Sequence, residues 1–163
     1  MLVLLLLAAL QTTSKPAAPD PLAPLTVYNG SWTIHALHTM AGEGKSDQLV
    51  NHCTRTVAYY TCEQVVNGKP MALLVFVPGD GPGKFHSQPI LPNGHSTGRG
   101  DLTIDGDHWT FLGKDVEPAK TTIFRTENYF KGPDAIHFEQ FESTDDAKTW
   151  TKTNEGDENR LRP

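Results

Sequence analysis

Short apolar segments separated by turn residues recur about every eight to twelve positions from Ser31 onward. No stretch sustains the apolar period of roughly 3.6 residues that marks an amphipathic helix. β-Branched and aromatic residues are frequent in the segments, as in strands. The pattern predicts an all-β chain with strands at Ser31–Thr39, Gln48–Thr56, Tyr59–Val66, Pro70–Val77, Lys84–Ile90, Gly98–Ile104, His108–Lys114, Thr121–Phe130, Ala135–Ser143 and Thr149–Asn154.

The separators between these segments have the composition of tight turns. Asn67-Gly68, Asn93-Gly94 and Asp105-Gly106 are dipeptides typical of type I′ hairpins, in which both central residues have positive φ. Because nearly every connection is of hairpin length, strands adjacent in sequence are expected to pair. Closing such a meander removes its two exposed edges. The sequence therefore predicts an antiparallel up-and-down barrel of about eight to ten strands, with any helix between Pro21 and Asn29.

The segment Met71–Val77 differs from the other predicted strands because it is apolar at every position. A strand of this kind is expected to be covered on both faces. The N-terminal segment around Leu25–Tyr28 is one candidate cover. A contact between two copies of the chain is the other, so a homodimer is the alternative prediction.

The N-terminus is typical of an exported protein. Leu2–Leu10 has the length of a signal-peptide apolar region and precedes small and polar residues, although it lacks the usual positive charge before it. It is about half as long as a membrane-spanning helix requires. We predict a signal peptide over residues 1–14, a linker rich in proline and alanine over 15–24, one domain over 25–163, and a periplasmic or secreted location.

Composition agrees with one small acidic domain. The chain has 163 residues, 37% hydrophobic and 20% charged, with a formal net charge of −5. The acidic balance argues against a nucleic-acid partner and against binding to anionic membranes through a basic face.

Cys53 and Cys62 are the only cysteines and fall on consecutive predicted strands. With Val57-Ala58 as the hairpin loop, the two cysteines face each other at a non-hydrogen-bonded position, with their Cα atoms about 4.5 Å apart. That separation is within the range of a disulfide, which an exported protein would retain.

The chain carries no complete catalytic or metal-binding motif. Gly94-His95-Ser96-Thr97-Gly98 matches the G-x-S-x-G elbow of serine hydrolases, but prolines precede it and no helix follows. The histidines lack the spacing of a metal motif, since His35 and His38 face opposite sides of one strand. We therefore predict no catalytic residue, no metal ligand and no cofactor.

Gly30-Ser31-Trp32 resembles the G-x-W opening of lipocalins and the wider calycin barrels. In that family the tryptophan closes one end of the barrel, and a basic residue near the chain end packs over its ring. The resemblance implies this role for Trp32, with Arg160 as the nearest basic candidate.

The segment from Ser143 to Trp150 resembles the Asp-box hairpin, S-x-D-x-G-x-T-W. In that motif the aspartate, here Asp145, accepts backbone N–H bonds across the turn, so its role is structural. Ala147 stands where glycine is usual, and alanine disfavours positive φ.

Taken in order and spacing, these features resemble an uncharacterised family of short secreted bacterial proteins, a domain of unknown function with a lipocalin-like barrel. The similarity extends from about Leu25 to Arg160. It implies no catalytic residues.

Three functional hypotheses remain open. The first is a barrel that binds a small apolar or amphipathic molecule, with Trp32 near the closed end and Arg125, His137 or Glu139 as polar contacts if they face inward. The second is an enzyme that uses an interior His or Glu as acid or base. The third is a dimerising interaction module. With Lys131–Asp134 as a loop, Asn128 is expected opposite His137, and the face that points inward stays undetermined.

Overall fold

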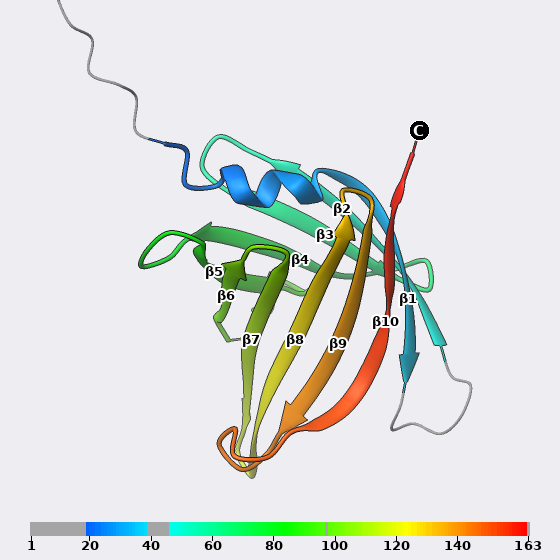
Figure 1. Cartoon of the computed structure of the whole chain (residues 1–163). Helices are drawn as coiled ribbons and strands as arrows, with labels where there is room; N and C mark the ends of the chain where they lie inside the picture. The colour runs from blue at the N-terminus through cyan, green and yellow to red at the C-terminus, as the bar shows by residue number, and fades with distance from the viewer. Residues whose placement is uncertain (1–18, 39–45, 97, 163) are drawn as a thin grey trace, which may run out of the picture.

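A computed structural model describes residues 19–38, 46–96 and 98–162; the predicted signal peptide lies outside them. One short 3₁₀ helix and ten strands form the fold of this described part (Figure 1). The elements are η1 (Ala23–Tyr28), β1 (Gly30–His38), β2 (Ser46–Arg55), β3 (Tyr60–Val66), β4 (Lys69–Pro78), β5 (Lys84–Ile90), β6 (Gly100–Asp105), β7 (His108–Glu117), β8 (Lys120–Gly132), β9 (Ala135–Ser143) and β10 (Thr151–Leu161). Each strand pairs antiparallel with its sequence neighbours, and β1 pairs with β10 to close the barrel.

The predicted all-β barrel is confirmed, and the helix lies in the expected interval. Two strands, β5 and β9, have the predicted bounds. The largest difference is at the C-terminus, where β10 extends to Leu161 instead of ending at Asn154. Among the described helices, none is long and apolar enough to cross a membrane.

One of the three dipeptide turns has the predicted conformation. Asn67 and Gly68 have φ of 49° and 76°, the positive values that a type I′ turn requires. The prediction is wrong for the other two, because only their glycines, Gly94 and Gly106, have positive φ.

The 3₁₀ helix η1 covers one end of the barrel, here called the closed end (Figure 1). Trp32 is 0% exposed there, and its Nε1 donates to the carbonyl of Tyr28 at 2.9 Å. Arg160 lies over the Trp32 ring, with Cζ 4.3 Å from the centroid, as the resemblance to lipocalins implied. Leu22, assigned to the linker by the sequence analysis, is 2% exposed and packs in the same core. The end where helix and barrel meet is therefore tightly packed.

The predicted disulfide is confirmed. Cys53 and Cys62 are bonded, are directly opposite on β2 and β3, and have Cα atoms 4.0 Å apart. Both residues are buried and line the inside of the barrel. The bond therefore joins two neighbouring strands from within the core.

Replacing both cysteines with serine is expected to lower the free energy of unfolding by about 2.5 kcal/mol, because the crosslink closes a short loop in the unfolded chain. Urea unfolding followed by circular dichroism measures the change. The wild-type protein treated with reductant is the matched control and should lose a similar amount. Unchanged stability in both samples would contradict the prediction.

The outer face of β4 is not covered by the described part of the chain. Met71 and Leu73 point outward and are 47% and 39% exposed, whereas Ala72 and Phe76 on the inner face are buried. The expectation that the N-terminal segment covers this face is wrong, because η1 packs at the closed end. A contact between two copies stays a prediction, which sedimentation equilibrium tests.

The hairpin between β9 and β10 has the hydrogen bonds of the Asp-box motif. Asp145 Oδ1 accepts the backbone N–H groups of Lys148 and Thr149 at 3.1 and 2.9 Å. The Thr149 hydroxyl donates to Oδ2 at 2.6 Å, and these bonds lower the pKa of Asp145 to about 2. Asp146 and Ala147 have φ of 58° and 62°. Ala147 thus adopts the left-handed conformation that glycine prefers.

Replacing Ala147 with glycine is expected to stabilise the protein by about 0.5–1 kcal/mol, because glycine adopts positive φ without a Cβ clash. Thermal unfolding measures the gain. Ala119→Gly, in the β7–β8 turn outside the positive-φ region, is the control and should be neutral or destabilising. Equal effects of the two substitutions would show that the φ of Ala147 carries no strain.

Candidate functional site

The barrel encloses a cavity of about 410 Å³, lined by side chains from η1 and every strand. This barrel cavity lies in the volume range of sites for small molecules. Its lining is mostly apolar and includes Leu74, Phe111 and Phe138. Phe124, on the inner face of β8, also lines it and is 40% exposed, which marks the end away from η1 as the open end.

Four polar side chains in the barrel cavity carry buried atoms that have no hydrogen-bond partner in the described structure. The atoms are Asn51 Oδ1, Tyr60 Oη, Asn128 Oδ1 and Glu158 Oε2. Tyr60, Asn128 and Glu158 are 1%, 3% and 6% exposed. Because buried polar groups in folded proteins are usually hydrogen-bonded, these atoms are available for a guest molecule or for water.

Glu158 and Asn128 form the polar part of the cavity together with Tyr28 of η1. Asn128 Nδ2 donates to the Tyr28 hydroxyl and, at 3.4 Å, to Glu158 Oε1. Burial raises the pKa of Glu158 to about 7, although the bond from Asn128 acts in the opposite direction. The centroid of the Tyr28 ring lies 5.2–5.5 Å from the ring centroids of Trp32, Trp109 and Phe130. These three rings hold the Tyr28 side chain in place.

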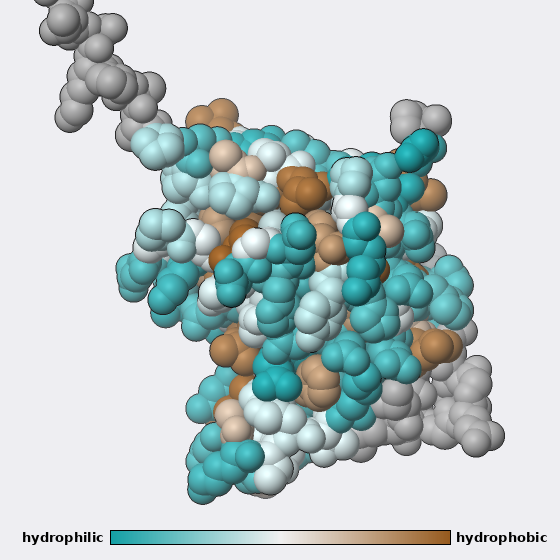
Figure 2. Space-filling model, viewed as in Figure 1, coloured by the Kyte–Doolittle hydropathy of each residue, from teal (hydrophilic) through white to brown (hydrophobic). Residues whose placement is uncertain are grey.

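Trp32 lies near the closed end as expected, but it is not among the residues that line the barrel cavity. Arg125, His137 and Glu139 project from the opposite side of the sheet, on the outer face of β8 and β9. Their strand neighbours Thr126, Asn128, Phe138 and Gln140 line the cavity instead. The condition on which these three were proposed as ligand contacts, that they face inward, is not met. The face of β7–β10 on which they lie is largely hydrophilic (Figure 2).

The expected register of the β8–β9 hairpin is wrong by one residue. His137 is opposite Tyr129 and not Asn128, because the register shifts between Phe130 and Gly132. Because of this one-residue shift, every residue of β9 beyond the shift lies opposite a different residue of β8 from the one expected.

Ser96 of the G-x-S-x-G segment lies in the connection between β5 and β6. It forms a bridge with Ile90, and its hydroxyl donates to the Pro89 carbonyl at 3.0 Å. The described residues on either side of position 97 form no strand-to-helix turn, so their arrangement differs from a hydrolase elbow.

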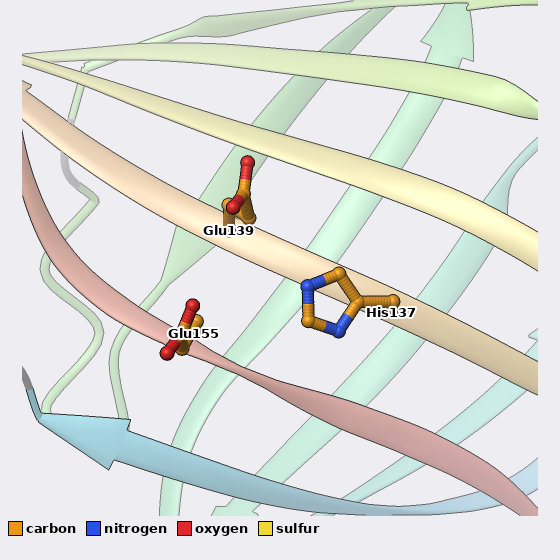
Figure 3. A group of neighbouring side chains, drawn as sticks. All are labelled: His137, Glu139 and Glu155. Atoms are coloured by element: carbon orange, nitrogen blue, oxygen red, sulfur yellow. The ribbon is translucent and has the colours of Figure 1, made fainter.

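Within the described part of the chain, one group of metal-ligating side chains lies together: His137, Glu139 and Glu155, on the outer face of β9 and β10 (Figure 3). Their ligand atoms are within 4.8 Å of one another. Lys152 Nζ donates to both carboxylates, at 3.0 Å to Glu155, and its bond to Glu139 lowers the pKa of that carboxyl. One ammonium group thus already bonds to both carboxylates and balances one of their two negative charges.

The remaining predicted polar residue, Arg125, packs between two aromatic rings. Its Cζ lies 4.6 Å from the Phe141 centroid and 4.3 Å from that of Trp150, and its Nε is 3.1 Å from Glu127 Oε1. These contacts fix the end of the Asp-box hairpin against the barrel wall.

The fold is shared with solved structures of low sequence identity. Rv2717c from M. tuberculosis matches with a TM-score of 0.63 and 14% identity, over 90% of this chain and 100% of that one. The S-type phycobiliprotein lyase CPES from Guillardia theta matches with a TM-score of 0.50 and 13% identity, over 86% and 92%. At these identities the likeness shows the fold alone. No family model and no curated protein matches this chain.

Proposed function

We propose that this protein is an exported binding protein that holds a small amphipathic molecule in its barrel cavity. The observation that carries the proposal is an apolar cavity of about 410 Å³ whose wall presents buried, unpartnered polar atoms on Asn51, Tyr60, Asn128 and Glu158. Sites for small molecules combine these two properties. The polar contacts we propose are these four residues, in place of the outward-facing Arg125, His137 and Glu139.

Export is supported by the disulfide, since such bonds persist in oxidising compartments. The apolar run at the N-terminus is the second support. Both observations support the proposal of a periplasmic or secreted location. A lipocalin-like mode of binding, with the guest entering past Phe124, agrees with the exposure of this residue.

Apolar contacts alone are expected to give an affinity weaker than micromolar. Burying roughly 200 Å² of apolar guest surface at about 25 cal/mol per Å² contributes on the order of 5 kcal/mol before the cost of association. Tighter binding therefore requires hydrogen bonds to the polar atoms of the cavity.

The experiment has two parts. Native mass spectrometry of protein purified from its own host should show a retained small molecule. In addition, the neutral dye N-phenylnaphthylamine should become fluorescent on binding the wild-type protein. Thr126→Trp, which places a large side chain in the cavity, should abolish both signals.

Thr103→Trp, an exposed position on the outer face of β6, is the matched control and should leave both signals unchanged. Circular dichroism of the two variants checks that each is folded. Dye binding that survives Thr126→Trp in a folded protein would place the dye outside the cavity and contradict the proposal.

An acid–base enzyme is the second candidate, and Glu158 is the observation that favours it. A buried carboxyl with a pKa of about 7 can donate or accept a proton near neutral pH. A nitrobenzisoxazole tests this capacity, because a base removes its C–H proton while the N–O bond breaks to give a nitrile and a phenolate. The wild-type rate should rise as Glu158 ionises, and Glu158→Gln should lower it about a hundredfold. Equal rates in both proteins would remove this candidate.

A further inference from the structure

Glu158 is a buried acid that forms no ion pair with a cation of the described residues. It is 6% exposed, Oε1 accepts a bond of 3.4 Å from Asn128, and Oε2 has no partner among the described residues. Directly opposite it lie Ile34 on β1 and Ile136 on β9, both of which are buried. The residues across the strands therefore offer no charge to balance an ionised Glu158.

The other titratable side chains of the barrel cavity are Tyr28, Tyr60, Lys114 and Asp115. Tyr28 and Tyr60 are buried, and burial raises the pKa of both phenols, so both are neutral. Arg160, two residues further along β10 on the same face, lies over Trp32 and is paired with Asp134 at 2.8 Å, and it also donates to three backbone carbonyls. Lys114 is the one cation among the lining residues, but it is five residues further along β7 than Trp109, which is opposite Asn128. Five residues of strand span about 17 Å, so this ammonium lies towards the open end and away from Glu158.

The unpartnered oxygens of the cavity are acceptors. Asn51 Oδ1, Asn128 Oδ1 and Oε2 of an ionised Glu158 accept hydrogen bonds. The Tyr60 hydroxyl can also donate, as can the Glu158 carboxyl when it is protonated. A guest with acceptors alone would leave these oxygens unsatisfied, whereas a guest with N–H groups would satisfy them. An anionic guest would also be repelled by an ionised Glu158.

We propose that the guest is a protonated amine on an apolar body, which places its nitrogen against Glu158 and its apolar part toward the open end. This inference rests on the proposed binding function and defines the chemical class of the ligand. The amine supplies the charge and the donors that the barrel wall lacks around this carboxyl. The apolar lining near Phe111 and Phe124 contacts the remainder of the molecule.

The inference includes a definite pH dependence. Without a guest, burial keeps the pKa of Glu158 at about 7, so protonation competes with amine binding below that pH. Affinity for the amine should therefore increase about tenfold between about pH 6 and about pH 8, while the amine itself remains charged. A neutral guest of the same shape should show no such increase.

Calorimetric titration of the full chain with naphthylmethylamine, naphthalenemethanol and naphthoate at about pH 8 tests the inference. These probes share one ring system and differ in the polar group. The amine is expected to bind at least about tenfold more tightly than the alcohol, with the acid weakest. Glu158→Gln should bring amine and alcohol within about threefold, and the outer-face control Glu139→Gln should keep the preference.

The outcomes separate the inference from the proposed function. One outcome is that Thr126→Trp blocks binding of the alcohol while the wild-type protein binds the amine no more tightly than the alcohol. In that case the cavity binds guests, and the inference that the guest is an amine is wrong. If none of the probes and no host molecule binds, both proposals fail. If Glu158→Gln does not fold, the wild-type pH series decides, and an amine affinity that is flat with pH overturns the inference.

Discussion

Trp32→Ala is expected to lower the free energy of unfolding by about 3–5 kcal/mol, the range for removing a buried aromatic side chain. Trp32 is 0% exposed, and its ring lies 5.5 Å from that of Tyr28. Its loss leaves a void at the closed end, leaves the Tyr28 carbonyl without its indole donor, and removes the surface on which Arg160 rests. The void accounts for most of the loss, because the surrounding chain relaxes only in part.

Urea unfolding followed by circular dichroism measures this effect. Tyr59→Ala removes an aromatic ring that is 50% exposed and is the control, with an expected loss below about 1 kcal/mol. Comparable losses from the two substitutions would show that the closed end contributes little to stability.

The second large effect is a gain. Glu158→Gln is expected to stabilise the protein by about 3 kcal/mol at slightly alkaline pH and to have little effect near pH 5. The folded state holds the pKa of Glu158 at about 7, against an ordinary value of 4.5. The difference corresponds to about 3 kcal/mol between the two protonation states.

The sign follows from proton binding. Between about pH 4.5 and about pH 7 the folded protein binds the proton of Glu158 more tightly than the unfolded chain, so this residue favours folding less as the pH rises. Below that window both states are protonated, and above it the folded state carries the whole cost of a buried charge. Glutamine is neutral throughout and avoids this cost.

Denaturant unfolding of both proteins from about pH 5 to about pH 8 measures the difference. Glu139→Gln is the control of opposite sign, since the bond from Lys152 lowers the pKa of Glu139. If the change in the free energy of unfolding caused by Glu158→Gln does not depend on pH, the folded protein does not raise the pKa of the Glu158 carboxyl.

The sequence predicted the barrel because its main signals are local. Turn dipeptides such as Asn67-Gly68 and the runs between them depend on neighbouring residues alone, and short connections leave antiparallel pairing as the simple arrangement. The Cys53–Cys62 pair follows from the same hairpin arithmetic. Each of these features forms between residues close together in the chain.

The candidate site was missed because β10 is polar. Thr151–Leu161 contains no run of apolar residues, so its pattern beyond Asn154 does not indicate a strand. The resemblance that placed Arg160 over Trp32 could have indicated that Glu158 faces the inside of the barrel. If Arg160 pairs with Trp32 on neighbouring strands, Glu158 two residues earlier is on the same inner face.

By itself the sequence determined the strands, the order in which they pair and the disulfide, because these depend on short-range patterns and on a side-chain period of two. The tertiary structure decided which face of each strand is inside. A register shift at Lys131 sets the partners of His137, and closure of β1 onto β10 brings Glu158 between Ile34 and Ile136. Both depend on contacts between distant parts of the chain, where one residue of register decides whether a polar group meets water or the barrel cavity.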